Sequence, residues 1–312
     1  MNKPVLSLCM PTNGVIEWVF PVLESIYCQN VDETEFEVII TDNGDNKPFK
    51  EKIIEYKKNH TNLEYKETDA LPFLNEIESY KCANGKLIKF VNHRTKLIFG
   101  ALEKLIDFAK KNIGEKPIIY FANGVLQLKR EQHIYPDFNE FVNNLSYWSS
   151  WSTGMTIWKD DFERLPENIS SFNELFPHTT VLFNERSRGK YIIDNSLIFD
   201  ELPQGKKQKG DYDLFQAFGI EYPGIICDLL RDGDITSETF RSVVKENLYF
   251  VATLYFNYCI RKQYCSYNLD GFKNIIGIFY SKRDLRNSIY KYAINRILGK
   301  VRGIVIHDFK RK

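Results

Sequence analysis

Residues 87–105 read LIKFVNHRTKLIFGALEKL, and this stretch predicts a strand, a polar turn and a helix, the combination that repeats along the first part of the chain. Residues 86–91 form an apolar run typical of a buried strand, and residues 100–109 place apolar side chains at helical spacing on one face. Between the strand and the helix lie Asn92, His93, Arg94 and Thr95. In an open parallel sheet, ligands bind beyond the carboxyl ends of strands, which is where this turn falls.

The same alternation continues on either side of this stretch. Strand-like runs occupy residues 5–10, 36–41, 63–67, 86–91 and 116–121. Helical patterns occupy residues 16–28, 49–59 and 71–82, and another follows Gly100. Strands that alternate with helices of this length indicate βαβ units. We therefore expect an α/β protein with an open, mostly parallel sheet flanked by helices.

The chain changes character twice after residue 125. Residues 135–166 are more aromatic and less regular, and residues 146–158 (SYWSSWSTGMTIW) suit either a half-buried strand lining a sugar or base pocket or a core strand. Residues 191–199 are strand-like, and from residue 212 the pattern is helical. We expect two domains, residues 1–220 and a helical, basic extension at residues 221–312.

Composition excludes some classes of function. The chain of 312 residues is 43% hydrophobic and 27% charged, with a net charge of +1, which does not suit a general nucleic-acid binder. Residues 281–312 contain ten Lys or Arg and two Asp, so this end is +8 and the rest of the chain is −7. A basic end on an acidic body predicts contact with an anionic partner.

The expected location is the cytoplasm. None of the six cysteines forms a CxxC pair, and most lie in apolar runs, so we expect buried free thiols. The first residues do not resemble a signal peptide, and the sequence contains no apolar run long enough to cross a membrane.

Polar residues follow three of the predicted strands. They are Pro11, Thr12 and Asn13 after the first strand, Asp42, Asn43 and Gly44 after the second, and Asn92, His93 and Arg94 after the fourth. Each cluster alone is compatible with ordinary turn chemistry. Three clusters at one sheet edge predict a binding site.

The ordered set LSLCMPTNG (6–14), FEVIITDNGD (36–45), ANGKLIKFVN (83–92) and GALEKLIDF (100–108) resembles family 2 glycosyltransferases of the GT-A fold, of the bacterial surface-polysaccharide type. The resemblance is good over residues 4–125 and looser to about residue 220. It implies a nucleotide-binding half at residues 1–125, an acceptor-side half at 126–220, and inverting transfer of a sugar from a nucleoside diphosphate, most simply UDP, to a saccharide.

The resemblance also suggests roles for residues. Asp42 would bind the base, and Pro11, Thr12, Asn13 and Asn43 would shape the nucleotide pocket. Asn75 falls where the family places a residue near the nucleotide or sugar, although a solvent-facing residue within a helix explains it equally well.

The fourth strand end departs from the family. An acidic DxD-type cluster usually holds a divalent cation there, whereas this chain has Asn92 and then His93-Arg94-Thr95. Arginine stays protonated and cannot ligate a metal, but its guanidinium can bind a diphosphate through two hydrogen bonds. Three explanations stay open: a metal-independent site in which Arg94, with or without His93, replaces the cation; a metal held by Asp69 or Asp161; or a catalytically degenerate binding protein. We expect no metal cofactor, although Mg²⁺ or Mn²⁺ stays an alternative.

Three further elements complete the expected site. Lys206 and Lys209, in a lysine-rich loop, would close over the diphosphate or simply face solvent. His178, in FNELFPHTTVLF (172–183), occupies the position of the family's general base, with Glu174 and Asp161 as alternatives.

The last helix, residues 288–306, mixes apolar and basic residues and suits either an anionic membrane surface or core packing. The resemblance implies a saccharide or lipid-linked oligosaccharide acceptor at the inner face of the membrane, in cell-surface polysaccharide synthesis. The rival expectation is a GT-A protein that binds a saccharide or a partner without catalysis.

Overall fold

The computed structural model describes residues 3–128, 130–203, 210 and 212–301. The chain forms two compact units, Met1–Phe141 with Trp148–Leu202, and Val142–Tyr147 with Pro203–Lys312. We predicted the boundary after residue 220. It falls earlier because Phe215 lies in the core of the helical unit and Asp213 accepts a hydrogen bond from the Gly271 amide at 2.6 Å.

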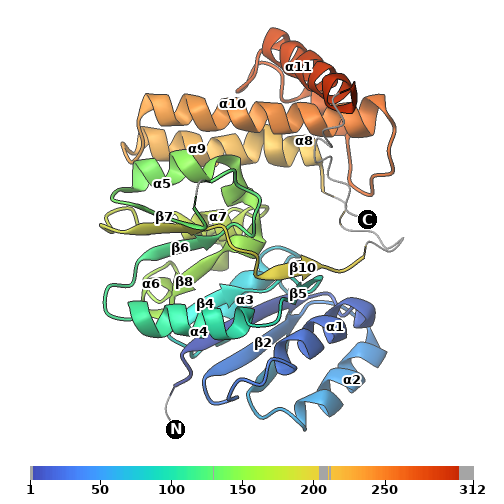
Figure 1. Ribbon diagram of the computed structural model, residues 1–312. Helices are drawn as coiled ribbons and strands as arrows, with labels where there is room; N and C mark the ends of the chain where they lie inside the picture. The colour runs from blue at the N-terminus through green and yellow to red at the C-terminus, as the bar shows by residue number, and fades with distance from the viewer. Residues whose placement is uncertain (1–2, 129, 204–209, 211, 302–312) are drawn as a thin grey trace. The chain divides into compact units, whose positions relative to one another are not determined.

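The first unit is built on a five-stranded sheet, shown in Figure 1. Its strands are β1 (Leu6–Thr12), β2 (Phe36–Asp42), β3 (Leu63–Glu67), β4 (Leu87–Phe90) and β8 (Thr156–Trp158), in the order β3-β2-β1-β4-β8. The first four run parallel, and β8 is an antiparallel edge strand. The predicted α/β class with a mostly parallel sheet is confirmed.

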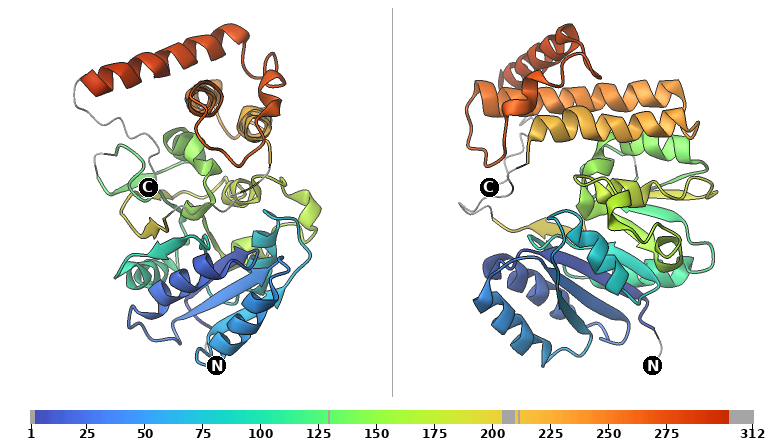
Figure 2. Two further views of the ribbon diagram at one scale, coloured as in Figure 1. Left: turned by 90° about the vertical axis from the view of Figure 1, so that its right-hand side faces the viewer. Right: turned by 180° about the vertical axis from the view of Figure 1, so that it is seen from behind.

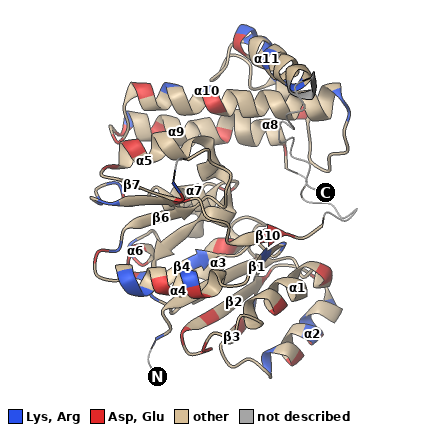
Figure 3. Ribbon diagram, in the orientation of Figure 1, with Lys and Arg blue, Asp and Glu red and all other residues tan. Residues whose placement is uncertain are grey.

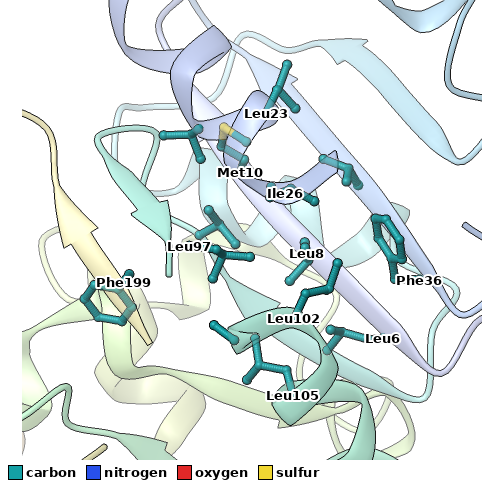
Figure 4. Close-up of a cluster of buried hydrophobic side chains, with 14 of the residues drawn as sticks. Leu6, Leu8, Met10, Leu23, Ile26, Phe36, Leu97, Leu102, Leu105 and Phe199 are labelled. Carbon is teal, nitrogen blue, oxygen red and sulfur yellow. The ribbon is translucent and has the colours of Figure 1, made fainter. Parts of the chain in front are cut away.

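Helices cover both faces of this sheet. Helices α1 (Ile16–Tyr27), α2 (Lys47–Lys57) and α4 (Ala101–Asn112) pack on one face, and α3 (Asn75–Cys82) packs on the other. Alternate residues of a strand face opposite sides. Leu6, Leu8 and Met10 therefore point into the cluster shown in Figure 4, while the Cys9 thiol faces the Ser79 carbonyl of α3 at 3.5 Å.

Two smaller sheets complete the first unit. β5 (Thr95–Leu97) pairs antiparallel with β10 (Phe199–Glu201). β6 (Ile118–Phe121) pairs parallel with β9 (Tyr191–Asp194), which pairs antiparallel with β7 (Gln132–Tyr135). The predicted strand at 191–199 is thus two strands in different sheets, and the last predicted strand of the first half belongs outside the main sheet.

The other elements between residues 138 and 182 are short. Residues 146–158, predicted as one strand, are two 3-10 turns, η1 (Ser146–Ser150) and η2 (Ser152–Gly154), followed by β8. The other elements are α6 (Lys159–Phe162), η3 (Ile169–Ser171) and α7 (Pro177–Leu182). Helix α5 (Phe138–Leu145) begins in the first unit and ends in the second.

The second unit is helical, as predicted. It contains α8 (Leu214–Gln216), η4 (Ala217–Glu221), α9 (Tyr222–Arg231), α10 (Ser237–Leu254), η5 (Tyr255–Ile260), η6 (Asp270–Lys273) and α11 (Lys282–Val301). Helices α9 and α10 lie side by side in Figures 1 and 2, and α11 packs on α10. Buried Asn247 links α10 to η4 and to the segment before α11, because its amide donates to the Phe218 carbonyl and the Tyr280 hydroxyl at 2.6 and 2.7 Å.

Two predictions about the whole chain can be compared with the structure. All six cysteines are free, but only Cys9 is buried, Cys28 is exposed, and the other four are partly exposed. None of the helices in the described ranges has the length and apolar composition needed to span a bilayer.

Candidate functional site

The carboxyl ends of β1, β2 and β4 meet at one edge of the main sheet. Thr12 and Asp42, the last residues of β1 and β2, are partners in the parallel register. The Asn43 amide donates to the Thr12 carbonyl at 3.1 Å, and His93, which follows β4, lies 2.8 Å from the Thr12 hydroxyl through Nδ1. The three polar clusters predicted from the sequence are therefore adjacent, and we call them the strand-end site.

Asp42 is almost fully buried and has protein partners on both carboxylate oxygens. Oδ1 accepts from the Gly44 amide at 2.9 Å, and Oδ2 accepts from the Tyr65 hydroxyl at 3.0 Å. Burial raises the pKa of this carboxyl, and the two hydrogen bonds offset part of the rise. Each oxygen keeps a second lone pair, so Asp42 can still accept a hydrogen bond from the base of a nucleotide.

The two loops after β1 and β2 hold each other in place. Asn46 joins the two loops by donating to the Gly14 carbonyl at 2.6 Å, and the Asn43 side chain donates to the carbonyl of Ala70, which follows β3, at 2.9 Å. A Cβ on Gly44 would overlap the backbone of Asn13, so only glycine allows this approach. Asn13 is exposed and Pro11 is partly exposed at the same edge, which leaves both accessible to a ligand.

Asn75 lies at the strand-end site, and its burial excludes one of the two expectations for it, that of a solvent-facing residue. It begins α3 and is 1% exposed, so it does not face solvent. Its amide donates to the carbonyls of Thr41 and Thr12 at 2.9 and 3.3 Å, and its oxygen accepts from the Thr68 hydroxyl at 2.8 Å. Asn75 thus ties the ends of β1 and β2 together, and its described hydrogen bonds are all made within the protein.

His93 is a neutral member of the site. Burial and the charge of Arg94 lower the pKa of His93 to about 3, so its ring is uncharged at neutral pH. The expectation that His93 adds a second positive charge is therefore not supported by its surroundings. Asn92 has a local role, since its side-chain oxygen accepts from the Arg94 amide at 3.0 Å.

Arg94 supplies the positive charge of the strand-end site. Its guanidinium carbon lies 5.4 Å from the centroid of the Trp18 ring, a cation–π geometry. Its Nη1 atom is buried and has no hydrogen-bond partner among the described residues. A buried guanidinium nitrogen without an acceptor is costly, so an anionic ligand at this position would satisfy it.

The residues after β4 do not fit a divalent metal. Mg²⁺ and Mn²⁺ prefer carboxylate and carbonyl oxygens, whereas this position presents an arginine and an imidazole already bonded to Thr12. Within the described ranges, no group of three or more His, Cys, Asp or Glu is arranged to hold a metal ion.

The geometry around His178 does not suit a general base that meets an acceptor. The residue is 4% exposed in α7, and Nε2 donates to the Ser150 carbonyl at 2.9 Å. Nδ1 faces Glu76 Oε1 of α3 at 3.6 Å. Burial lowers the pKa of His178 to about 4 and raises that of Glu76 well above its usual value. His178 is therefore neutral at pH 7, and it faces the buried Glu76 carboxyl inside the protein.

The other predicted residues divide into three kinds. Asp161 is 1% exposed and forms ion pairs with Arg164 and Arg188 at 2.6 and 2.8 Å, which indicates a structural role. Glu174 is exposed in the segment before α7. Lys206 and Lys209 lie outside the described residues.

Three residues of structural interest were missed from the sequence. Trp18 lies in an apolar helical pattern that predicts only core packing, and Tyr65 lies on an edge strand. Lys89 looked like an ordinary strand residue, but its ammonium is buried and donates to the carbonyls of Phe90, Thr153 and Met155. Burial lowers the pKa of Lys89 to about 7. A charged residue inside an apolar strand run was the available signal.

Comparison with known proteins identifies the fold. No family model matches the sequence, and no curated protein matches it. Among solved structures, S. aureus TarS has a TM-score of 0.59 at 14% identity, over 93% of this chain and 53% of that chain. The chain thus spans about half the length of TarS in that structure.

Two shorter TarS structures agree with this result. TarS 1-349 in complex with UDP-GlcNAc has a TM-score of 0.57 at 13% identity, covering 96% of this chain and 92% of that chain. TarS 1-349 in complex with UDP has a TM-score of 0.53 at 15% identity, covering 95% and 84%. The chain therefore has the GT-A fold of these glycosyltransferase structures.

Proposed function

We propose that this protein is a glycosyltransferase that moves a sugar from a nucleoside diphosphate, most simply UDP, to a saccharide acceptor. The fold supports this function, and so does the composition of the strand-end site. The observation on which the proposal rests is the Arg94 guanidinium. It is packed on Trp18 and has a buried nitrogen without a described protein acceptor.

In the proposed reaction, the acceptor oxygen attacks the anomeric carbon while the bond to the diphosphate oxygen breaks, with inversion. Negative charge develops on the leaving nucleoside diphosphate. Arg94 would stabilise that charge through hydrogen bonds from its guanidinium, so a fixed cation does the work that a metal does elsewhere. Asp42, Asn13 and Asn43 would bind the nucleoside, and Lys206 and Lys209 would add positive charge from their loop.

The acceptor proton needs a base. His178 and Asp161 are buried and have partners within the protein, whereas Glu174 is exposed. Of the three general bases predicted from the sequence, we therefore propose Glu174. Replacing Glu174 with Gln should lower kcat while leaving nucleotide affinity unchanged. A Glu174→Gln variant with wild-type kcat would exclude this assignment.

The proposal is tested by nucleotide binding and turnover. Calorimetry with UDP, GDP, CDP and dTDP in EDTA should show one preferred nucleotide. The Arg94→Ala variant should bind that nucleotide roughly 10-fold more weakly, or weaker still. Lys96→Ala is the matched control, because Lys96 is a nearby exposed cation on β5. A wild-type protein that binds none of these nucleotides and releases none from their sugar derivatives would refute the function.

The same turnover assay, run with and without EDTA, tests whether the reaction needs a metal. Turnover that survives EDTA but is lost in Arg94→Ala supports replacement of the metal by the guanidinium. Turnover abolished by EDTA and restored by Mn²⁺ would show instead that a metal is used.

A second candidate function is a GT-A protein that binds a saccharide or a partner without catalysis. The burial of His178 and Asp161 favours it, because two of the three predicted bases are engaged within the protein. Binding of a nucleotide sugar without turnover on any saccharide or lipid-linked acceptor would select this candidate.

The proposed setting is cell-surface polysaccharide synthesis at the inner face of the membrane. Helix α11 supports it, since Tyr290, Ile294, Ile297 and Leu298 are exposed at spacings that place them on one helical face. Figure 3 shows several basic residues on the same helix. The protein should float with anionic vesicles at low salt, and an Ile294→Ser/Ile297→Ser variant should not. Equal flotation of both would rule against α11 as the contact.

A further inference from the structure

Trp18 contacts two of the residues, His93 and Arg94, that stand in place of the expected acidic cluster. Its ring lies 5.4 Å from the Arg94 guanidinium carbon, and its centroid lies 5.1 Å from that of the His93 ring, at an interplanar angle of 50°. The three residues come from two segments, since Trp18 lies in the first turn of α1, whereas His93 and Arg94 follow β4. One indole therefore packs against both His93 and Arg94.

The position of Trp18 is set by the helix that contains it. Its amide donates to the Val15 carbonyl at 3.1 Å in the first turn of α1, and Val19 and Phe20, the next residues, are buried in the core. Trp18 itself is only partly buried. A partly exposed indole on a rigid helical turn can hold a guanidinium in one place while leaving its edge open to a ligand.

His93 connects the same support to the loop after β1. Its Nδ1 shares a hydrogen bond with the Thr12 hydroxyl at 2.8 Å, and that hydroxyl accepts from the Gly14 amide at 3.1 Å. Trp18, His93 and Thr12 thus form a continuous set of contacts between the two loops. Because His93 is neutral, it fills this position without competing with Arg94 for an anion.

We propose that Trp18 is the positioning residue of the strand-end site, holding the Arg94 guanidinium in the orientation that binds the donor diphosphate. The proposal rests on the proposed function and adds a residue to it. A metal ion has a position fixed by its ligands, whereas a free arginine side chain samples many rotamers, and ordering it costs entropy on binding. The Trp18 ring restricts those rotamers before the ligand arrives.

A double-mutant cycle tests whether Trp18 acts through Arg94. Calorimetry with UDP, GDP, CDP and dTDP in EDTA is run on wild type, Trp18→Leu, Arg94→Ala and the double variant. Trp18→Leu keeps an apolar side chain but lacks the π face, and it should weaken the preferred nucleotide roughly 3- to 10-fold. In the Arg94→Ala background the same substitution should have no effect, because the group that it positions is gone.

Trp18→Phe is the conservative control and should bind within about twofold of wild type, since it keeps an aromatic face. Circular dichroism and the melting temperature of each variant establish that it is folded.

The outcomes separate this inference from the proposed function. If Trp18→Leu weakens binding by the same factor with or without Arg94, Trp18 contacts the ligand directly and the inference is wrong. If Arg94→Ala weakens binding but Trp18→Leu does not, the proposed function stands and the positioning role does not. If wild type binds none of the nucleotides, the proposed function fails and the inference fails with it.

Discussion

Replacing Asn75 with Asp should make the stability of the protein strongly pH-dependent. The wild-type amide donates to two buried carbonyls, those of Thr41 and Thr12. A carboxylate would instead place negative charge against both carbonyl oxygens at a position that is 1% exposed. The new side chain should therefore stay protonated in the folded state.

The size of the effect follows from the cost of holding that proton. With an unfolded-state pKa of about 3.9, keeping the group protonated costs about 5 kcal/mol near pH 7.5 and about 1.5 kcal/mol near pH 5. The loss of one donated hydrogen bond adds about 1 kcal/mol at either pH. Because the folded-state pKa is raised, the variant is most stable below the unfolded pKa and loses stability as pH rises. The penalty should thus grow by about 3 kcal/mol between the two pH values.

Urea denaturation of wild type and Asn75→Asp at both pH values measures this difference. Asn287→Asp, at an exposed position of α11, is the control and should show almost no pH-dependent penalty. A penalty for Asn75→Asp that is the same near pH 5 and pH 7.5 would refute the reasoning. It would mean that the carboxylate is solvated, and hence that Asn75 does not tie the strand ends together.

Three further substitutions test the surroundings of the site. Because the pKa of His178 is lowered to about 4, the wild type should lose about 2 kcal/mol of folding stability between pH 7.5 and pH 5 that His178→Gln does not lose. Glu76 is present in both proteins, so an equal loss of stability in the two would contradict this prediction. Asp161→Asn should destabilise the protein by about 2 kcal/mol, because two arginines lose a buried partner; an unchanged urea midpoint would show that the ion pairs add nothing. Gly154→Ala should lower the melting temperature, because its Cβ would overlap the Tyr120 ring, whereas Gly189→Ala, which meets no atom within 4 Å, should not; similar melting of the two would contradict the close contact.

Much of the fold could be predicted because its signals are local. The alternation of apolar runs with helical patterns predicted β1 to β4 and α1 to α4 in order, and the residues that end each strand predicted the strand-end site. The 191–199 run shows the limit of such patterns. It is continuous in sequence, yet Asp194 ends one strand and Phe199 begins another in a different sheet, because the partner strands, and not the run itself, determine where pairing stops.

The sequence by itself determined the α/β class, the helical C-terminal part, and the position of Arg94 directly after the fourth strand. Only the tertiary structure decided the state of each side chain. Arg94 packs on Trp18, 76 positions away in the chain, and His178 is buried against Glu76, 102 positions away. Residue type and spacing specify which groups can ionise or bond, but burial and the partners brought in from distant segments decide whether they are charged, paired or open to a ligand.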